Sequence, residues 1–232
     1  MTTFKPPTEW TPPDVFPTDL LVNAKEVAID TETRDPNLKE KGPGYIRGDG
    51  EIVGISFACD GFEGYFPFAH ESGFNFPKNK VISFAKKVCA SNSDKIFHNA
   101  SYDMGWLGSE GIKVNGRIID TMVVAPLIDE NQYWYTLNAL GREYVNEGKT
   151  EAELNAAAEE WGLDPKAEMW RLPSAYVGTY ATQDAALTLK LWNHFKTLIE
   201  EQNLWNIFDL EMEVLPVLYE MKKKGVRVDT ER

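Results

Sequence analysis

The chain has 232 residues, 43% of them hydrophobic, which is enough to bury a sizeable core as one domain or one domain with an appendage. Its 36 acidic and 24 basic residues give a net charge of −12, which argues against a broad surface for phosphates or acidic membranes. Any nucleic acid that it handles must therefore be held locally.

Sequence features that would direct the chain out of the cytoplasm are missing. Two cysteines suggest a reducing compartment, and the three separated histidines do not give Cys/His zinc spacing. The first residues contain no apolar signal segment, and no run approaches 18 apolar residues. We therefore expect a cytoplasmic protein with neither export nor a membrane span.

The N-terminal residues 1–18 carry five of the 13 prolines, which favours an extended arm on the surface, and we assign residues 1–25 to it. The next stretch, Glu26 to Thr33, reads EVAIDTET and predicts a buried strand that ends in Asp30 and Glu32. Residues i and i+2 of a strand point to the same face, so these two carboxylates would lie side by side.

Such a pair of carboxylates requires a counter-charge. Two like charges about 4 Å apart repel by roughly 4 kcal/mol at an effective dielectric near 20, and a hard divalent cation would remove that repulsion. The alternative is a strand that ends in solvent, with a turn that begins at Asp30 or Thr31. Further carboxylates at the same place would favour the metal.

The middle of the chain alternates between strands and helices. Residues 34–50 have turn signals without a period and predict a mobile loop. Residues 51–58 and 62–69 predict an antiparallel hairpin, to which we confine antiparallel pairing. Further patterns predict a helix that Pro77 opens, strands at 95–99 and 117–119, and helices at 100–108 and 121–128.

The rest of the chain is mostly helical. Helical patterns cover residues 136–161, about 174–202 and about 204–224, and Gly225 gives a cap signal after the last. This order of elements predicts an α/β protein whose mixed sheet has helices on both faces and is followed by a helical C-terminal part.

A third carboxylate is expected in the interior. If a helix begins after Asn99, then Asn99, Asp103 and Leu107 share a face, and Leu107 directs that face to the core. A buried unpaired carboxylate costs several kcal/mol unless it is neutralised or coordinates a ligand. The alternative is that Asp103 is solvated and Asn99 is an N-cap.

A fourth carboxylate lies on the long helix. Tyr180 and Asp184 belong to the stripe that Leu187, Leu191, Phe195 and Leu198 continue. Asp184 needs a partner, and a metal shared with Asp30 and Glu32 would supply one. The alternative for Tyr180 is a core aromatic whose hydroxyl is hydrogen-bonded.

These motifs resemble a known family. Asp30-Thr31-Glu32, Asn99 with Asp103, and Tyr180-x-x-x-Asp184 are similar, in order and spacing, to the three motifs of the DEDD 3′→5′ exonucleases. The tyrosine position indicates the tyrosine subclass, because Thr179 stands where the histidine subclass carries its general base. The closest resemblance is to the proofreading domain of family A, DNA polymerase I-like, DNA polymerases of bacteria and bacteriophages.

The resemblance implies an RNase H-like fold with a five-stranded sheet and a monomeric domain over residues 26–202. Residues 203–232 would form the helix that leads toward a polymerase domain outside this chain. The implied activity is two-metal hydrolysis, with Mg²⁺ or Mn²⁺, of the 3′-terminal phosphodiester of single-stranded or frayed DNA, with release of 5′-mononucleotides. The host would be a bacterial or phage-infected cell.

The resemblance also implies roles for particular residues. Asp30, Glu32 and Asp184 would hold the first metal, Asp30 would bridge to a second metal that Asp103 also holds, and Tyr180 would orient the water. These five residues form the expected catalytic set. The residues expected to contact nucleic acid are Thr31, Thr33, Asn99, Tyr102, Trp170 and Arg171.

The sequence departs from the family pattern at one position, and some alternatives stay open. Pro36 stands where the family has a leucine wedge, with Leu38 nearby, and we assign Asp120 to helix N-capping. We expect Asp103→Ala to abolish hydrolysis without lowering the melting temperature. An RNase D-like trimmer of RNA 3′ ends and a catalytically silent nucleic-acid-binding domain are the alternative functions.

Overall fold

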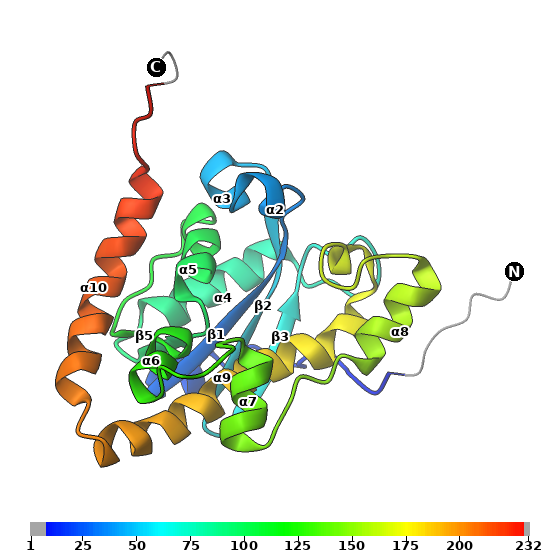
Figure 1. The fold of residues 1–232 in the computed structure, drawn as a ribbon. Helices are drawn as coiled ribbons and strands as arrows, with labels where there is room; N and C mark the ends of the chain where they lie inside the picture. The colour runs from blue at the N-terminus through cyan, green and yellow to red at the C-terminus, as the bar shows by residue number, and fades with distance from the viewer. Residues whose placement is uncertain (1–7, 230–232) are drawn as a thin grey trace, which may run out of the picture.

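A five-stranded sheet with the order β3-β2-β1-β4-β5 forms the centre of the computed structural model, which describes residues 8–229 (Figure 1). The strands are β1 (Glu26–Arg34), β2 (Glu51–Cys59), β3 (Phe62–Pro67), β4 (Asp94–Phe97) and β5 (Ile118–Asp120). β1 is parallel to β4 and β4 to β5, whereas β2 is antiparallel to both of its neighbours. The mixed sheet is therefore confirmed.

One detail of the predicted pairing is wrong. Antiparallel pairing is not confined to the β2–β3 hairpin, because β1 also pairs antiparallel with β2, from Ala28 opposite Ala58 to Arg34 opposite Glu51. The segment between β1 and β2 turns straight back to the neighbouring position in the sheet. No crossover helix is needed for this connection, unlike a parallel one.

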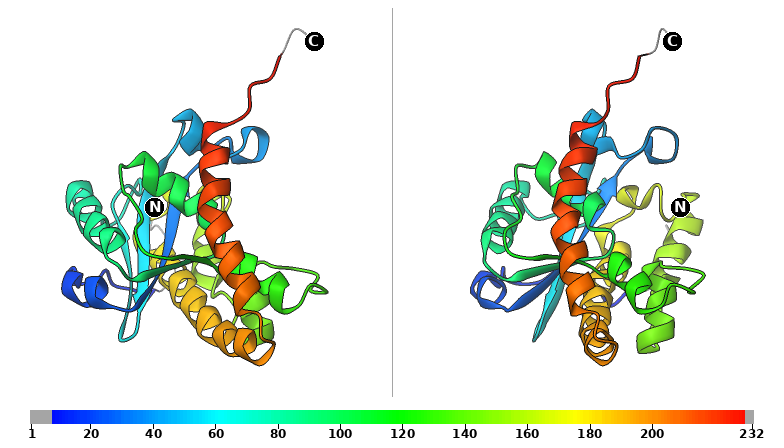
Figure 2. Two further views of the ribbon diagram at one scale, coloured as in Figure 1. Left: turned by 90° about the vertical axis from the view of Figure 1, so that its left-hand side faces the viewer. Right: turned by 60° about the vertical axis from the view of Figure 1, so that its left-hand side comes forward.

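Helices cover both faces of the sheet (Figures 1 and 2). One face packs on α4 (Lys78–Ala90) and α5 (Ala100–Ser109), and the other on α6 (Thr121–Ile128), α7 (Leu137–Val145) and the long α9 (Ser174–Glu201). The side chains of β1 alternate between these layers. Val27 and Ile29 pack toward α4 and α5, whereas Ala28 packs with residues of α9.

Three segments differ from their predicted structure. Within the predicted loop 34–50 lie two short helices, α2 (Leu38–Lys41) and α3 (Gly44–Arg47), and the Arg47 guanidinium donates to the carbonyls of Lys41 and Gly42. The predicted helical stretch 136–161 is broken at Asn146, whose φ is 53°, before α8 (Ala152–Trp161). The helix η1 (Met169–Arg171) lies in the loop before α9.

The described part of the proline-rich N-terminal segment is packed on the domain. Its first seven residues lie outside the described range. Trp10 lies over Gly178 of α9, where an added Cβ would be 2.0 Å from the indole ring. Phe16 stacks on Phe66 with ring centroids 5.2 Å apart, and α1 (Thr18–Asn23) buries Leu21 completely. The expectation of an unpacked arm is therefore wrong for residues 8–25.

The last helix, α10 (Trp205–Lys224), runs along the β5 edge of the sheet and ends at Gly225, as the cap signal predicted (Figure 2). Its inner side buries Phe208 and Met212. Its outer side exposes apolar residues, namely Leu210, Val217, Leu218 and Met221. Among the described helices, none is long and apolar enough to cross a membrane.

Candidate metal and catalytic site

Strand β1 divides the candidate site between its two faces. Asp30 and Glu32 continue the face of Ala28, toward α9, as their i, i+2 spacing predicts. Thr31 and Thr33 contact α5 instead, through Asp103 and Tyr102. Glu32 is 6% exposed and Asp30 keeps more of its surface in contact with solvent, so Asp30 is the more accessible of the two residues.

Helix α9 brings the third carboxylate to the same place. Asp184 is 3% exposed, and one of its carboxylate oxygens lies within 4.8 Å of one oxygen each of Asp30 and Glu32. Tyr180, one turn earlier, is also buried. The predicted convergence of Asp30, Glu32 and Asp184 is thus present in the structure. It joins parts of the chain that are distant in the sequence.

Asp103 lies beside this group but is not part of it. The residue is buried on α5, which agrees with the inward orientation inferred from Leu107. Its Oδ1 accepts hydrogen bonds from the backbone N–H of Thr31 at 3.0 Å and from the Thr31 hydroxyl at 2.6 Å. The charge of Asp30 is close enough to raise the pKa of Asp103 further than burial alone does.

The carboxylates disfavour one another's ionisation. Burial, followed by the charge of Asp184, raises the pKa of Asp30 to about 7, while the charge of Lys149 opposes this rise. Burial and the neighbouring acids also hold the pKa of Glu32 well above its usual range, and burial raises that of Asp184. Added positive charge would therefore stabilise the ionised cluster.

The unused oxygen atoms of the cluster fit a hard cation. Glu32 Oε1 and Asp184 Oδ1 are buried and have no hydrogen-bond partner. Buried carboxylate oxygens without a partner are costly, and Mg²⁺ and Mn²⁺ prefer ligands of this kind. The residues present therefore suit a divalent ion at Asp30, Glu32 and Asp184.

A lysine that the sequence analysis missed enters the cluster. Lys149 Nζ lies 2.5 Å from Asp184 Oδ2 and 3.2 Å from the Tyr180 hydroxyl. Lys149 belongs to the segment between α7 and α8, where the predicted helix is broken. The adjacent Gly148 was the available signal, because a glycine weakens the case for a continuous helix.

Comparisons with known proteins identify the family of this chain. A family model described as 3′–5′ exonuclease matches residues 18–200, which is well over half of the chain. The chain belongs to this 3′–5′ exonuclease family. The DNA-directed DNA polymerase of Pseudomonas phage M6 is 38% identical over 229 residues, covering 97% of this chain and 34% of that protein.

Solved structures show the same fold at low sequence identity. The POL domain of Pol1 from M. smegmatis, in complex with DNA primer-template and dNTP, aligns over 95% of this chain and 32% of that chain, with a TM-score of 0.66 and 16% identity. NrnC of Brucella melitensis with bound Mg²⁺ aligns over 92% and 93%, with a TM-score of 0.63 and 17% identity. The RNase H-like exonuclease fold is therefore confirmed.

The chain is short beside its polymerase relatives. It spans about a third of the length of several curated polymerases that it matches. The family model covers the sheet and its flanking helices through α9.

The residues expected to contact nucleic acid lie in three places. Thr31 is buried and holds Asp103, while the Thr33 and Tyr102 hydroxyls are hydrogen-bonded to each other at 2.8 Å. Asn99 is exposed at the start of α5. In the third place, beside the end of β1, are Trp170, under the guanidinium of Arg34, and Arg171, which pairs with Glu71 and Glu168.

The assignment of Asp120 to helix capping is confirmed. Its carboxylate accepts from the N–H of Met122 in α6, and also from the N–H groups of Asn99 and Ala100 at the start of α5. Asn99 has a φ of 73°, and its side chain makes no capping hydrogen bond. Asp120 thus fixes two helix starts, and one of them sets the position of Asp103.

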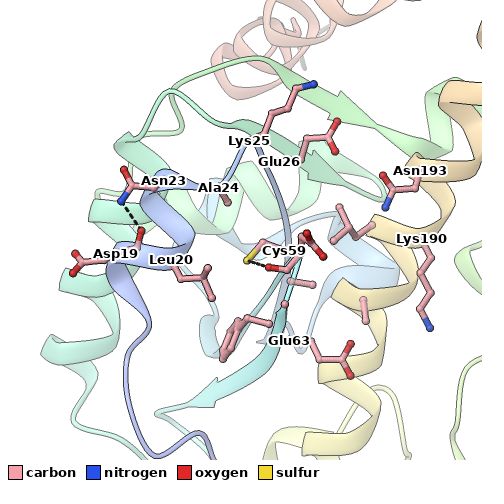
Figure 3. Close-up of a pocket in the computed structure, with 16 residues that line it drawn as sticks. Asp19, Leu20, Asn23, Ala24, Lys25, Glu26, Cys59, Glu63, Lys190 and Asn193 are labelled. Carbon is pink, nitrogen blue, oxygen red and sulfur yellow. Dashed lines mark hydrogen bonds between the residues drawn. The ribbon is translucent and has the colours of Figure 1, made fainter.

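The domain also has a separate pocket of about 860 Å³ at the opposite end of β1 (Figure 3). Glu26, Cys59 and Glu63 line it together with residues of α1 and α9. Its lining includes neither Asp30, Glu32 nor Asp184, so this pocket is distinct from the acidic cluster.

Proposed function

We propose that this chain is the proofreading 3′–5′ exonuclease domain of a DNA polymerase I-like enzyme and removes nucleotides from the 3′ end of DNA. The observation that carries the proposal is the meeting of Asp30, Glu32 and Asp184, with buried unpaired oxygens, in a member of this family. DNA is the favoured substrate because the relatives with the higher sequence identity are DNA polymerases.

Two divalent ions, Mg²⁺ or Mn²⁺, would stabilise the attacking and leaving oxygens of the phosphodiester and lower the pKa of the attacking water. Asp30, Glu32 and Asp184 are the residues that would hold the first ion. Asp30 and Asp103 would hold the second, and Thr31 fixes the orientation of the Asp103 carboxylate for this task.

Tyr180 supports assignment to the tyrosine subclass. Burial and the charge of Asp184 hold the pKa of its phenol well above its usual range, so the phenol stays neutral. A neutral hydroxyl can orient a water molecule by hydrogen bonding without removing its proton. The preceding residue, Thr179, donates to Glu153 and offers no general base.

The proposed substrate is a single-stranded or frayed 3′ end. Asn99, Tyr102 and Thr33 lie near Asp103, and Trp170 and Arg171 lie beside the end of β1. Aromatic stacking contributes roughly 1–3 kcal/mol per base, which suits an acidic protein that grips DNA locally. Leu38, at the start of α2, is 40% exposed and is our candidate for the missing leucine wedge.

We further propose that residues 26–202 form the exonuclease domain and that residues 203–232 lead to a polymerase domain. The exposed apolar residues of α10 and the greater length of the polymerase relatives support this division. The cytoplasm of a bacterium or of a phage-infected cell is the corresponding location.

A nuclease assay tests the proposal. 5′-labelled single-stranded DNA and RNA are incubated with Mg²⁺ or Mn²⁺, and in parallel with a chelator. We expect stepwise shortening of DNA that the chelator and Asp184→Asn both abolish. Asp60→Asn, which removes the same charge in the exposed hairpin turn, should retain activity. Preference for RNA would favour the RNase D-like function, and binding without cleavage would favour a silent domain.

A further inference from the structure

Lys149 places a positive charge beside Asp184, one of the residues that would hold a metal ion. Its ammonium group contacts Asp184 Oδ2 and the Tyr180 hydroxyl, and it lies 4.9 Å from the centre of the Tyr180 ring. The side chain is only 15% exposed. An ammonium group in this position already neutralises part of the charge that a divalent ion would neutralise.

The backbone around Lys149 is fixed from two sides. Its own N–H donates to Asn138 Oδ1 of α7 at 2.9 Å. On the α9 side, Gln183 accepts from the N–H of Thr150 and donates to the carbonyl of Gly148. Gln183 directly precedes Asp184. Its two hydrogen bonds therefore hold the backbone of Lys149 close to the carboxylate that the lysine side chain contacts.

The Lys149 side chain can change its conformation without any movement of the backbone. Its four-carbon stem rotates easily, and its ammonium group holds Asp184 through a point charge instead of a fixed planar geometry. When Asp30, Glu32 and Asp184 are all ionised, a single positive charge beside them leaves that cluster negatively charged overall. Two divalent ions would add four positive charges and would repel a neighbouring ammonium group.

We propose that the ammonium group of Lys149 is an exchangeable internal cation. It pairs with the Asp184 carboxylate in the metal-free protein and is displaced when divalent ions bind. The inference rests on the proposed function, because it assumes that metal binds this cluster. Lys149 is then a positioning residue that keeps the carboxylates together before metal arrives and competes with metal for Asp184.

Metal binding without DNA tests this competition directly. Mn²⁺ affinity is measured by titration calorimetry for the wild type, Lys149→Met and Lys149→Arg. We expect Lys149→Met to bind Mn²⁺ at least fivefold more tightly, and to melt at a lower temperature than the wild type in chelator. Lys149→Arg, which keeps the charge, should stay near the wild type. Lys190→Met, which removes a surface pair with Glu147, should change neither measurement.

A second measurement uses the wild type and does not depend on whether a variant folds. Acylation of lysine amines is followed by mass spectrometry with and without saturating Mn²⁺. Displacement predicts faster labelling of Lys149 with metal, while Lys190 stays unchanged. Equal Mn²⁺ affinities within twofold for the wild type and Lys149→Met, or labelling of Lys149 that metal does not change, would overturn the inference.

The proposed function and the inference fail differently. A wild type that binds no divalent ion overturns both. A wild type that binds metal and shortens DNA, while Lys149→Met binds Mn²⁺ no more tightly, overturns only the role of Lys149.

Discussion

The carboxylate of Asp103 is bound by Thr31 through two hydrogen bonds at a site that is 4% exposed. Removing the whole carboxylate leaves a buried N–H and a buried hydroxyl without an acceptor, and each such loss costs about 1–3 kcal/mol. The relief of repulsion from Asp30 acts in the opposite direction. The structure therefore changes the expectation, made from sequence, that Asp103→Ala preserves the melting temperature.

Asp103→Asn and Asp103→Ala separate these two effects. Asparagine keeps an oxygen acceptor for Thr31 and removes the charge, so we expect stability in chelator equal to or above that of the wild type. Alanine should lower the free energy of unfolding by about 1–3 kcal/mol. Both variants should lose hydrolysis. Urea unfolding in chelator measures the difference, and equal stability of the two variants would contradict it.

Asp30 makes the free energy of unfolding of the metal-free protein depend on pH. Its pKa of about 7 in the folded state exceeds the ordinary value of 3.8, so the unfolded chain releases this proton at lower pH. The stabilising contribution is complete below about pH 3.8 and is lost as pH rises through about 7. The slope is at most about 1.4 kcal/mol per pH unit for one proton.

The test compares Asp30→Asn with the wild type, because buried His70 and half-buried His98 oppose this slope. Burial lowers the pKa of both histidines to about 4, so their contribution rises with pH. We expect Asp30→Asn to gain stability relative to the wild type between pH 4.5 and pH 7.5 in chelator. Urea unfolding at several pH values measures this, and a constant difference would show that Asp30 does not titrate there.

At the scale of elements, β2 and β3 pack beside the part of β1 that carries Glu32. Gly54 of β2 is opposite Glu32 of β1, and a Cβ added at Gly54 would lie 2.1 Å from the Tyr65 hydroxyl. Tyr65 is completely buried, and its hydroxyl is hydrogen-bonded to His70 Nε2 at 2.7 Å. The phenol thus occupies space that only a glycine leaves open.

Gly54→Ala should therefore displace Tyr65 and destabilise the sheet beside Glu32. We expect a loss of about 1–3 kcal/mol in the free energy of unfolding, as for other overpacked cores. Ser56→Ala is the matched control, because the Ser56 hydroxyl is buried without a partner and its removal should cost little. Denaturant unfolding of both variants measures this, and equal losses would contradict the packing argument.

Elements with a strong local pattern could be predicted from the sequence. The apolar run before Asp30 and the stripe from Tyr180 to Phe195 fix which face is buried, so β1 and α9 were expected with the observed orientation. The position of Lys149 could not be predicted. Its side chain reaches Asp184 only because helix α7 ends at Asn146 and the following segment folds back on α9. No periodic pattern in the sequence predicts that contact.

Short connections were also beyond prediction. The helices α2 and α3 are four residues long, and α3 depends on a distant partner, because the Tyr45 hydroxyl donates to the carbonyl of Ser101 in α5. The packing of Trp10 and Phe16 likewise depends on distant residues. Proline content alone indicates an extended backbone, but it does not tell whether that backbone is packed.

For the whole molecule, the net charge of −12 restricts how the proposed DNA substrate would be held. Binding of a single strand should release few counterions, because each phosphate contact contributes about −0.7 to the slope of log K against log salt. We expect a slope no steeper than about −2 in the presence of Ca²⁺, and weaker binding in chelator. Fluorescence anisotropy with single-stranded DNA measures both, and a much steeper slope would indicate an extended basic surface.

The wide separation of the site residues along the chain has a consequence during translation. The carboxylates on β1 emerge from the ribosome early, but Asp184 must follow, and α9 must then dock on the sheet before three acids surround one position. A nascent chain that ends before α9 has no complete ion site. Under the proposed function, unfinished copies of the protein are therefore unable to degrade DNA.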